Sequence, residues 1–348
     1  MSFVSPPSRR AVLSQVLAAG ITSMSASANA RAGNKEAPAP QQSTFFDRFM
    51  VRGPFPVRTA NPLSFQLPNQ NRDLLVRVSY PDPSSAWNST PFPVVLFSHG
   101  ELSSKDLYNP IADLWASHGI VAILPTHIDS ESLGYKSGEM NQAAVLTSRI
   151  VDLTYLLDHL DEITMQAPTL AGHIDKERIG VGGHGFGSAA ALALAGLQLK
   201  TSSGTATGSG DPRIRALISY NGVGPLPLLG DNWSDITVPT FAAAGTNDPG
   251  MAGIDIDQTW RWRMSPFSLT HGKKRFGVSI TLGDHTYGGL IGNQDQSDKP
   301  DATGLAIVNA MSTAFIAAHL MDNREVKIFL ETIDLPAMTD GRAFLERS

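Results

Sequence analysis

The sequence predicts an α/β fold in which a mostly parallel central sheet carries helices on both faces. Short β-rich runs alternate with helical patterns along most of the chain, and repeated alternation of this kind is typical of parallel sheets. Some of the strand runs, such as 94–97 and 120–124, are continuously apolar, as expected of strands that are buried on both faces. The sequence contains no second core-sized pattern and no internal repeat, so one domain over residues 45–348 is expected.

The individual elements can be placed in chain order from these patterns. Strands are predicted at 74–80, 94–97, 120–124, 179–183, 214–218, 240–244 and 278–282, with 278–282 as the last one. Helices are predicted at 106–118, 142–161, 188–199 and about 303–321. A flexible loop is expected at 201–213 because that stretch is rich in Gly, Ser and Thr. Arg149 and Asp152, on the second of these helices, are expected to form ion pairs on its surface or against the sheet.

Composition excludes several classes of protein. Of 348 residues, 42% are hydrophobic and 17% are charged, which is enough apolar material for a sizeable core. The formal net charge of −5 gives no global electrostatic reason to bind nucleic acid or an anionic membrane. The chain has no cysteine, which excludes disulfides, thiolate zinc sites, iron–sulfur clusters and a cysteine nucleophile.

Residues 1–32 have the features of an export signal. The pair Arg9-Arg10 precedes a weakly apolar stretch, small residues follow, and no acidic residue occurs before Glu36. This pattern resembles a twin-arginine signal peptide and predicts a periplasmic or secreted protein, the alternative being a disordered N-terminus with a chance arginine pair. The apolar stretch is too short and too polar to span a bilayer, and no other stretch predicts a membrane span. Residues 33–44, which are polar and rich in Pro and Ala, are predicted to be a linker.

A glycine-rich turn, Gly183-His184-Gly185-Phe186-Gly187, lies between the predicted strand 179–183 and the helix after it. This is the layout of a nucleophile elbow, G-x-S-x-G, in which a sharp turn lifts a serine above the sheet. The outer glycines allow the strand and the helix to pack closely. The central residue here is Gly185 and not serine, so the expected nucleophile is missing.

Three other segments follow predicted strands and carry polar side chains: 97–101, 245–249 and 282–287. Because the carboxyl ends of parallel strands meet at one edge of a sheet, these segments are expected near the elbow.

With these segments in order, residues 53–330 resemble bacterial α/β-hydrolases of the dienelactone-hydrolase and platelet-activating-factor acetylhydrolase-like group. The matching segments are 53–57, 93–100, 173–181, 183–187 and 283–285. The resemblance implies an α/β-hydrolase fold and hydrolysis of carboxylic esters through an acyl-enzyme. It implies that His285 is the general base and that Asp248 orients it. It also implies that the backbone N–H groups of Glu101 and Phe186 form the oxyanion hole, and that Gly185 stands at the nucleophile position.

Further residues are expected to line the site. His99, His127 and His184 follow strands on the active face and are predicted to contact substrate. Trp260 follows the acid loop and is expected either to cover an acyl pocket or to pack under a long loop. Asp284, next to the histidine, is a weaker candidate for the acid. No three ligands have metal-binding spacing and no dinucleotide fingerprint occurs, so neither metal nor cofactor is expected. The predicted partner is a small-molecule or polymeric ester, and no oligomeric state is predicted.

Gly185 has a physical rationale. An elbow nucleophile adopts positive φ, which costs a residue with a Cβ about 1–3 kcal/mol, whereas glycine adopts it at little cost. A change from serine to glycine therefore preserves the fold and removes acyl transfer. Three interpretations stay open: a lost or replaced nucleophile in an inactive or trapped hydrolase, a non-catalytic periplasmic ligand-binding pseudoenzyme, or a water molecule activated by His285. Ser188 and Ser98 are the alternative nucleophiles, and both are expected to be structural.

Overall fold

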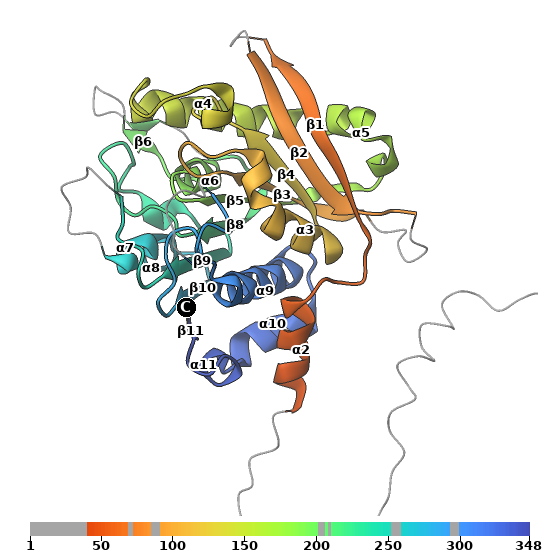
Figure 1. The fold of residues 1–348 in the computed structure, drawn as a ribbon, viewed down its shortest axis with the longest axis vertical. Helices are drawn as coiled ribbons and strands as arrows, with labels where there is room; N and C mark the ends of the chain where they lie inside the picture. The colour runs from red at the N-terminus through yellow and green to blue at the C-terminus, as the bar shows by residue number, and fades with distance from the viewer. Residues whose placement is uncertain are drawn as a thin grey trace, which may run out of the picture. The chain divides into compact units, whose positions relative to one another are not determined.

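A mostly parallel sheet with helices on both faces forms the fold, which confirms the predicted fold class (Figure 1). The structure is a computed structural model that describes residues 40–68, 72–84, 91–200, 206–207, 210–251, 259–292 and 299–348. Within these residues one sheet contains the strands β1 (Val57–Leu67), β2 (Arg72–Pro81), β3 (Phe92–Ser98), β4 (Val121–Thr126), β5 (Ile174–His184), β8 (Ile214–Tyr220), β9 (Thr240–Gly245), β10 (Arg275–Ile280) and β11 (Ala343–Arg347).

The order of the strands across the sheet is β1-β2-β4-β3-β5-β8-β9-β10-β11. The strands from β4 to β10 run parallel to their neighbours. The pairs β1–β2, β2–β4 and β10–β11 are antiparallel. The parallel strands therefore place their carboxyl ends, and the loops that follow them, along one edge of the sheet.

Helices cover both faces of this sheet. One face packs against α3 (Asn109–Ser117) and α9 (Ala302–His319), and α2 (Pro40–Met50) and α10 (Arg324–Thr332) pack on α9 in the same core. The other face packs against α4 (Gln142–Asp158), α5 (Leu160–Gln166) and α6 (Gly187–Ala195). The shorter α7 (Trp260–Arg263) and α8 (Ser265–Leu269) lie against β9, and α11 (Leu335–Met338) contacts β11. Short 3₁₀ segments lie at Lys105–Tyr108, Glu131–Leu133, Pro168–Leu170 and Trp233–Asp235.

Alternate residues of the central strands build the two cores. In β3, Val95 and Phe97 face one core, whereas Val94 and Leu96 face the other. All four are buried, which explains why this strand is a continuous apolar run. Helix α9 is apolar on nearly every side. Among the described helices, it is the one that is long and apolar enough to cross a membrane. However, 78% of that stretch is buried inside the fold.

The structure differs from the predicted elements at several places. The strand predicted as the last is followed by β11, a charged strand at the sheet edge that lacks a continuous apolar pattern. The helix predicted at 142–161 is divided into α4 and α5, because the His159 backbone leaves the helical conformation at φ −118° and ψ 32°. Within the predicted loop 201–213, residues 206–207 form β7 (Ala206–Thr207), which pairs with β6 (Leu199–Lys200). Strand β1 was not predicted at all.

The described fold begins with α2, five residues before the end of the predicted linker. Residues 40–44, predicted as linker, are therefore part of a helix. Phe46 and Phe49, further along α2, bury their rings in the core and hold this helix against the fold. The predicted signal peptide, 1–32, and residues 33–39 of the predicted linker lie outside the described residues.

Buried histidine makes the stability of the fold sensitive to acid. His319 ends α9 between the rings of Phe276 and Phe315. Burial, and then Lys327 and Lys274, lower the pKa of His319 to about 4 from 6.5. Because the pKa of His319 is lower in the folded than in the unfolded chain, the neutral ring favours the folded state. This contribution to the free energy of unfolding is complete above pH 6.5 and is lost as the pH falls through 4.

We therefore expect the melting temperature to fall between pH 6.5 and pH 4, and His319→Gln to make that fall shallower. The matched control is His271→Gln, the same substitution at an exposed histidine, against which the slope for His319→Gln is compared. Thermal unfolding followed by circular dichroism at a series of pH values measures both. Equal slopes for His319→Gln and the parent chain would contradict the assignment.

Candidate active site

The turn between β5 and α6 has the backbone of a nucleophile elbow. Gly185 adopts φ +51°, in the left-handed region that favours glycine. The outer glycines are sterically required: a Cβ on Gly183 would lie 2.4 Å from the Gly187 carbonyl carbon, and one on Gly187 would lie 2.1 Å from the Ser98 carbonyl oxygen. The strand, the turn and the helix thus pack as closely as the sequence pattern predicts, with glycine at the position where a serine is expected.

Asp248 and His285 reach this turn from two other strand ends. Asp248 follows β9 and is 2% exposed, and His285 lies on the loop after β10 with 27% of its side chain exposed. The Nδ1 of His285 lies 2.6 Å from Oδ2 of Asp248, as in a hydrogen bond from imidazole to carboxylate. The opposite nitrogen, Nε2, lies 2.9 Å from the position that a Cβ on Gly185 would occupy. The structure therefore brings the predicted acid, base and nucleophile positions together.

Arg263, a residue that the sequence analysis missed, fixes the acid from behind. Its Nε donates to Oδ1 of Asp248 at 3.0 Å, and the Gly250 amide donates to the same oxygen at 3.0 Å. Burial acts to raise the pKa of Asp248, but His285 and Arg263 outweigh it, and the pKa lies below its usual value. The carboxylate is thus ionised and directed at His285. In the sequence, only its place among the aromatic residues of segment 260–263 distinguished Arg263 from other arginines.

A second missed residue, Asn221, positions the histidine loop. Its Nδ2 donates to the carbonyl oxygens of Asp284 and His285, both at 2.8 Å. His184 supports the same loop by donating from Nε2 to the His285 carbonyl at 2.8 Å, while its Nδ1 accepts from the Tyr108 hydroxyl at 2.8 Å. Burial lowers the pKa of His184 well below its usual value, so the ring is neutral. Two side chains, Asn221 and His184, thus fix the backbone that carries the base, and Tyr108 holds His184 in place.

The backbone N–H groups of Glu101 and Phe186 are the available oxyanion donors. Glu101 lies in the turn after β3, and Phe186 directly precedes α6. In the part of the chain that the structure describes, neither N–H donates a hydrogen bond. Both residues line the cleft that also contains His285, so the two donors border the place where a carbonyl oxygen would bind.

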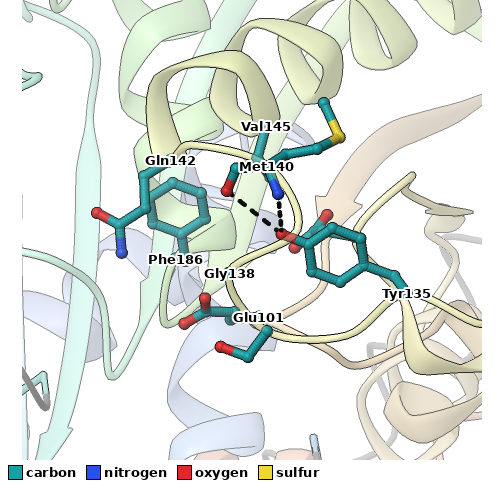
Figure 2. Close-up of a pocket in the computed structure, with 9 residues that line it drawn as sticks. Glu101, Tyr135, Gly138, Met140, Gln142, Val145 and Phe186 are labelled. Atoms are coloured by element: carbon teal, nitrogen blue, oxygen red, sulfur yellow. Dashed lines mark hydrogen bonds between the residues drawn. The ribbon is translucent and has the colours of Figure 1, made fainter.

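The cleft has a volume of about 770 Å³, and a small side pocket of about 140 Å³ adjoins it. The two cavities share Glu101, Ser137, Gln142 and Phe186 in their walls. Figure 2 shows the side pocket between Glu101, Phe186 and the segment from Tyr135 to Val145. The Tyr135 hydroxyl accepts a hydrogen bond from the Met140 amide at 3.2 Å, which fixes this wall.

Three of the four predicted substrate contacts lie elsewhere. His99 and His127 are 1% and 0% exposed, because they bond within the core: His99 Nε2 accepts from the His127 amide at 2.9 Å, and His127 Nδ1 donates to Asp152 at 2.8 Å. Trp260 packs on a small apolar cluster beside β9 and beneath the Arg261 guanidinium. None of these three is among the described residues that line the cleft, whereas His184 is.

The alternative serines and the alternative acid also have structural roles. Ser188 is fully buried, donates from Oγ to the Gly185 carbonyl and accepts from the Val223 amide, both at 2.8 Å. Ser98 is fully buried and hydrogen-bonded to His127 at 2.9 Å. Asp284 accepts from the Thr286 and Gly288 amides at 2.9 Å and thereby shapes its own loop. Within the described residues, no three His, Asp or Glu side chains are grouped as metal ligands.

Comparison with known proteins supports a hydrolase. A family model described as chlorophyllase, an α/β-hydrolase-like family, matches residues 66–218. The match includes the turn after β3 and the elbow, and it ends within β8, before Asp248 and His285. No match was found among curated proteins. Together with the sheet order, the match shows an α/β-hydrolase fold and a hydrolase scaffold of the esterase type.

Proposed function

We propose that this chain is a carboxylic-ester hydrolase of the Ser-His-Asp type whose nucleophile position is Gly185, so that it binds esters and hardly turns them over. One observation carries this proposal: His285 Nε2 lies 2.9 Å from the Cβ position of residue 185 while its Nδ1 is hydrogen-bonded to Asp248. The base thus lies beside the side chain that a serine at the elbow would carry, as in a Ser-His-Asp triad, once the imidazole has retreated slightly. We also propose the dienelactone-hydrolase and platelet-activating-factor acetylhydrolase-like group as the relatives, and export as the cellular fate.

With a serine at the elbow, each group would have a defined task. His285 Nε2 would take the hydroxyl proton as the oxygen attacks the ester carbonyl, and then return it to the leaving alcohol. Asp248 would stabilise the imidazolium that forms. The N–H groups of Glu101 and Phe186 would bind the carbonyl oxygen as it becomes negative. Water would then cleave the acyl-enzyme with the same base.

The side pocket indicates how the ester is oriented in the cleft. The leaving oxygen receives its proton from His285, so the alcohol part lies on that side of the cleft. The acyl part then extends past the oxyanion donors towards the side pocket, which Glu101 and Phe186 line and His285 does not. Its volume of about 140 Å³ is small beside the roughly 300–1,000 Å³ of common ligand pockets. Esters with short acyl groups are therefore the favoured substrate class.

In the chain as it stands, the attacking oxygen is absent. Only water could attack, and triad knockouts keep about 10³–10⁴-fold catalysis over water from the oxyanion hole and binding alone. We expect p-nitrophenyl acetate to be hydrolysed at no more than this residual rate, and His285→Ala to change that rate little. A clear activity that His285→Ala abolishes would favour the water mechanism instead.

The second candidate function is a periplasmic ligand-binding pseudoenzyme. Gly185 favours this candidate, because glycine adopts φ +51° without strain and carries no side chain that could attack an ester. The retained His285–Asp248 pair disfavours it, since binding alone does not require a base held by a buried carboxylate. Reinstating the serine separates the two candidates.

A further inference from the structure

Arg149 is a fully buried cation that lies directly behind the oxyanion turn. It projects from α4 and is 0% exposed. Its Nε donates to Oδ1 of Asp129 at 3.0 Å, and its Nη2 donates to Oδ2 at 2.6 Å. The remaining donors contact the turn after β3: Nη1 bonds to the Ser98 hydroxyl at 3.1 Å and to the His99 carbonyl, and Nη2 bonds to the Gly100 carbonyl at 3.2 Å.

The Gly100 carbonyl belongs to the same peptide group as the N–H of Glu101. This peptide bond is trans, so its C=O and N–H point in opposite directions. Arg149 holds the C=O end on the core side together with His99, whose Nδ1 donates at 2.7 Å, and the Ser103 amide at 3.3 Å. The N–H end is thereby directed away from these donors, towards the cleft that Glu101 lines. The positive charge beside the carbonyl oxygen also polarises the peptide group, which makes the N–H a better donor to an oxyanion.

The second donor is also in contact with Arg149. The guanidinium carbon lies 5.4 Å from the centre of the Phe186 ring, a cation–π distance, and the N–H of Phe186 is the other oxyanion donor. One planar group thus touches the two segments that carry the donors. A lysine could not replace it, because a single ammonium cannot hold Asp129 bidentately and reach two carbonyls as well.

Asp129 makes the buried charge tolerable. Burial acts to raise the pKa of Asp129, but Arg149 outweighs it and lowers that pKa to about 2. The pair is ionised at neutral pH, so the carboxylate offsets the cost of burying the guanidinium. The two carbonyls and the Ser98 hydroxyl accept the donors that Asp129 leaves free.

We propose that Arg149 is the positioning residue of the oxyanion hole: held by Asp129, it orients the Glu101 and Phe186 amides towards the substrate carbonyl. The proposal rests on the proposed ester hydrolysis for its chemical meaning. Its structural part, that Arg149 fixes the turn, is independent of any activity. The test therefore has one arm in the native chain and one in an active variant.

The first arm is hydrogen exchange in the native chain. The turn protects three amides, those of Gly100, Ser103 and His127, through hydrogen bonds to Tyr108, Gly100 and His99. We expect Arg149→Lys to make peptides containing these amides exchange about tenfold faster, because the turn opens more often. The matched control is Arg77→Lys, in which another buried arginine, on β2 and paired with Asp113 at 3.2 Å, is changed outside the turn.

The second arm compares esters with their thionoester analogues in the Gly185→Ser background. Sulfur accepts hydrogen bonds poorly, so a thionoester gains little from the oxyanion hole. We expect Arg149→Lys to lower kcat on the ester about 10²-fold with KM nearly unchanged, and to lower kcat on the thionoester much less. Arg77→Lys should leave the ratio of the two rates unchanged.

The outcomes separate the two proposals. Exchange in Arg149→Lys that equals exchange in Arg77→Lys would overturn the positioning role, whatever the activity. Equal losses on ester and thionoester would also overturn it, since a general loss of structure affects both substrates alike. An inactive Gly185→Ser chain with faster exchange in Arg149→Lys would refute the proposed hydrolysis and leave Arg149 as the residue that fixes the turn.

Discussion

Gly185→Ser is expected to raise hydrolysis of p-nitrophenyl acetate and butyrate by between about 10³- and 10⁶-fold. The reason is that the base and its orienting acid already lie beside residue 185. The Glu101 and Phe186 amides, which donate no hydrogen bond within the described residues, belong to residues that line the same cleft. The Cβ of the new residue would lie 2.9 Å from His285 Nε2, which is too close, so the imidazole has to retreat slightly. That side chain is 27% exposed to the cleft and has room to do so.

The same substitution should lower stability. A residue with a Cβ at φ +51° costs about 1–3 kcal/mol, so the free energy of unfolding should fall by that amount. Gly185→Ala is the matched control, with the same strain and no hydroxyl, and it should lose stability without gaining activity. His285→Ala in the Gly185→Ser background should remove the gained turnover. Well-folded but inactive Gly185→Ser would favour the ligand-binding alternative.

Arg263→Met is expected to lower the free energy of unfolding by about 3–5 kcal/mol. The substitution leaves the buried Asp248 carboxylate without the cation that bonds to Oδ1, and an unpaired buried charge is costly. In the Gly185→Ser background, turnover should fall as well, because Asp248 would be free to rotate away from His285.

Arg261, two residues earlier on α7, provides the comparison. It is exposed and stacks on Trp260 at 4.4 Å, so Arg261→Met should cost no more than about 1 kcal/mol. Chemical denaturation of both variants measures the difference. Adding Asp248→Asn to Arg263→Met should recover part of the lost stability, because it removes the unpaired charge. Equal costs for the two arginine variants would refute a special role for Arg263.

The sequence could predict what depends on local pattern. Buried strands are continuous apolar runs, and glycines mark the turn after β5, so the fold class and the elbow follow from neighbouring residues. The positions of Asp248 and His285 follow from the fact that each lies shortly after a parallel strand, at the same edge of the sheet.

Long-range contacts could not be predicted in the same way. Asn221, Arg149 and Arg263 act through hydrogen bonds to residues 15 to 64 positions away, which no spacing in the chain reveals. His99 and His127 illustrate the opposite error. A residue after a buried strand can turn into the core as easily as into the cleft, and its hydrogen-bond partners decide which. His127 turns inward to Ser98 and Asp152, and His99 turns inward to accept from the His127 amide.

The central claim, that an intact hydrolytic site surrounds Gly185, can be tested most directly by covalent labelling. Three proteins are incubated with a fluorophosphonate: the native chain, Gly185→Ser, and Gly185→Ser with His285→Ala. Intact-protein mass spectrometry then measures the mass of each. The claim predicts one adduct on Gly185→Ser, located by peptide mapping at position 185, with no adduct on the native chain and little on the double variant. A folded Gly185→Ser chain that stays unlabelled, or a native chain labelled at another residue, would contradict it.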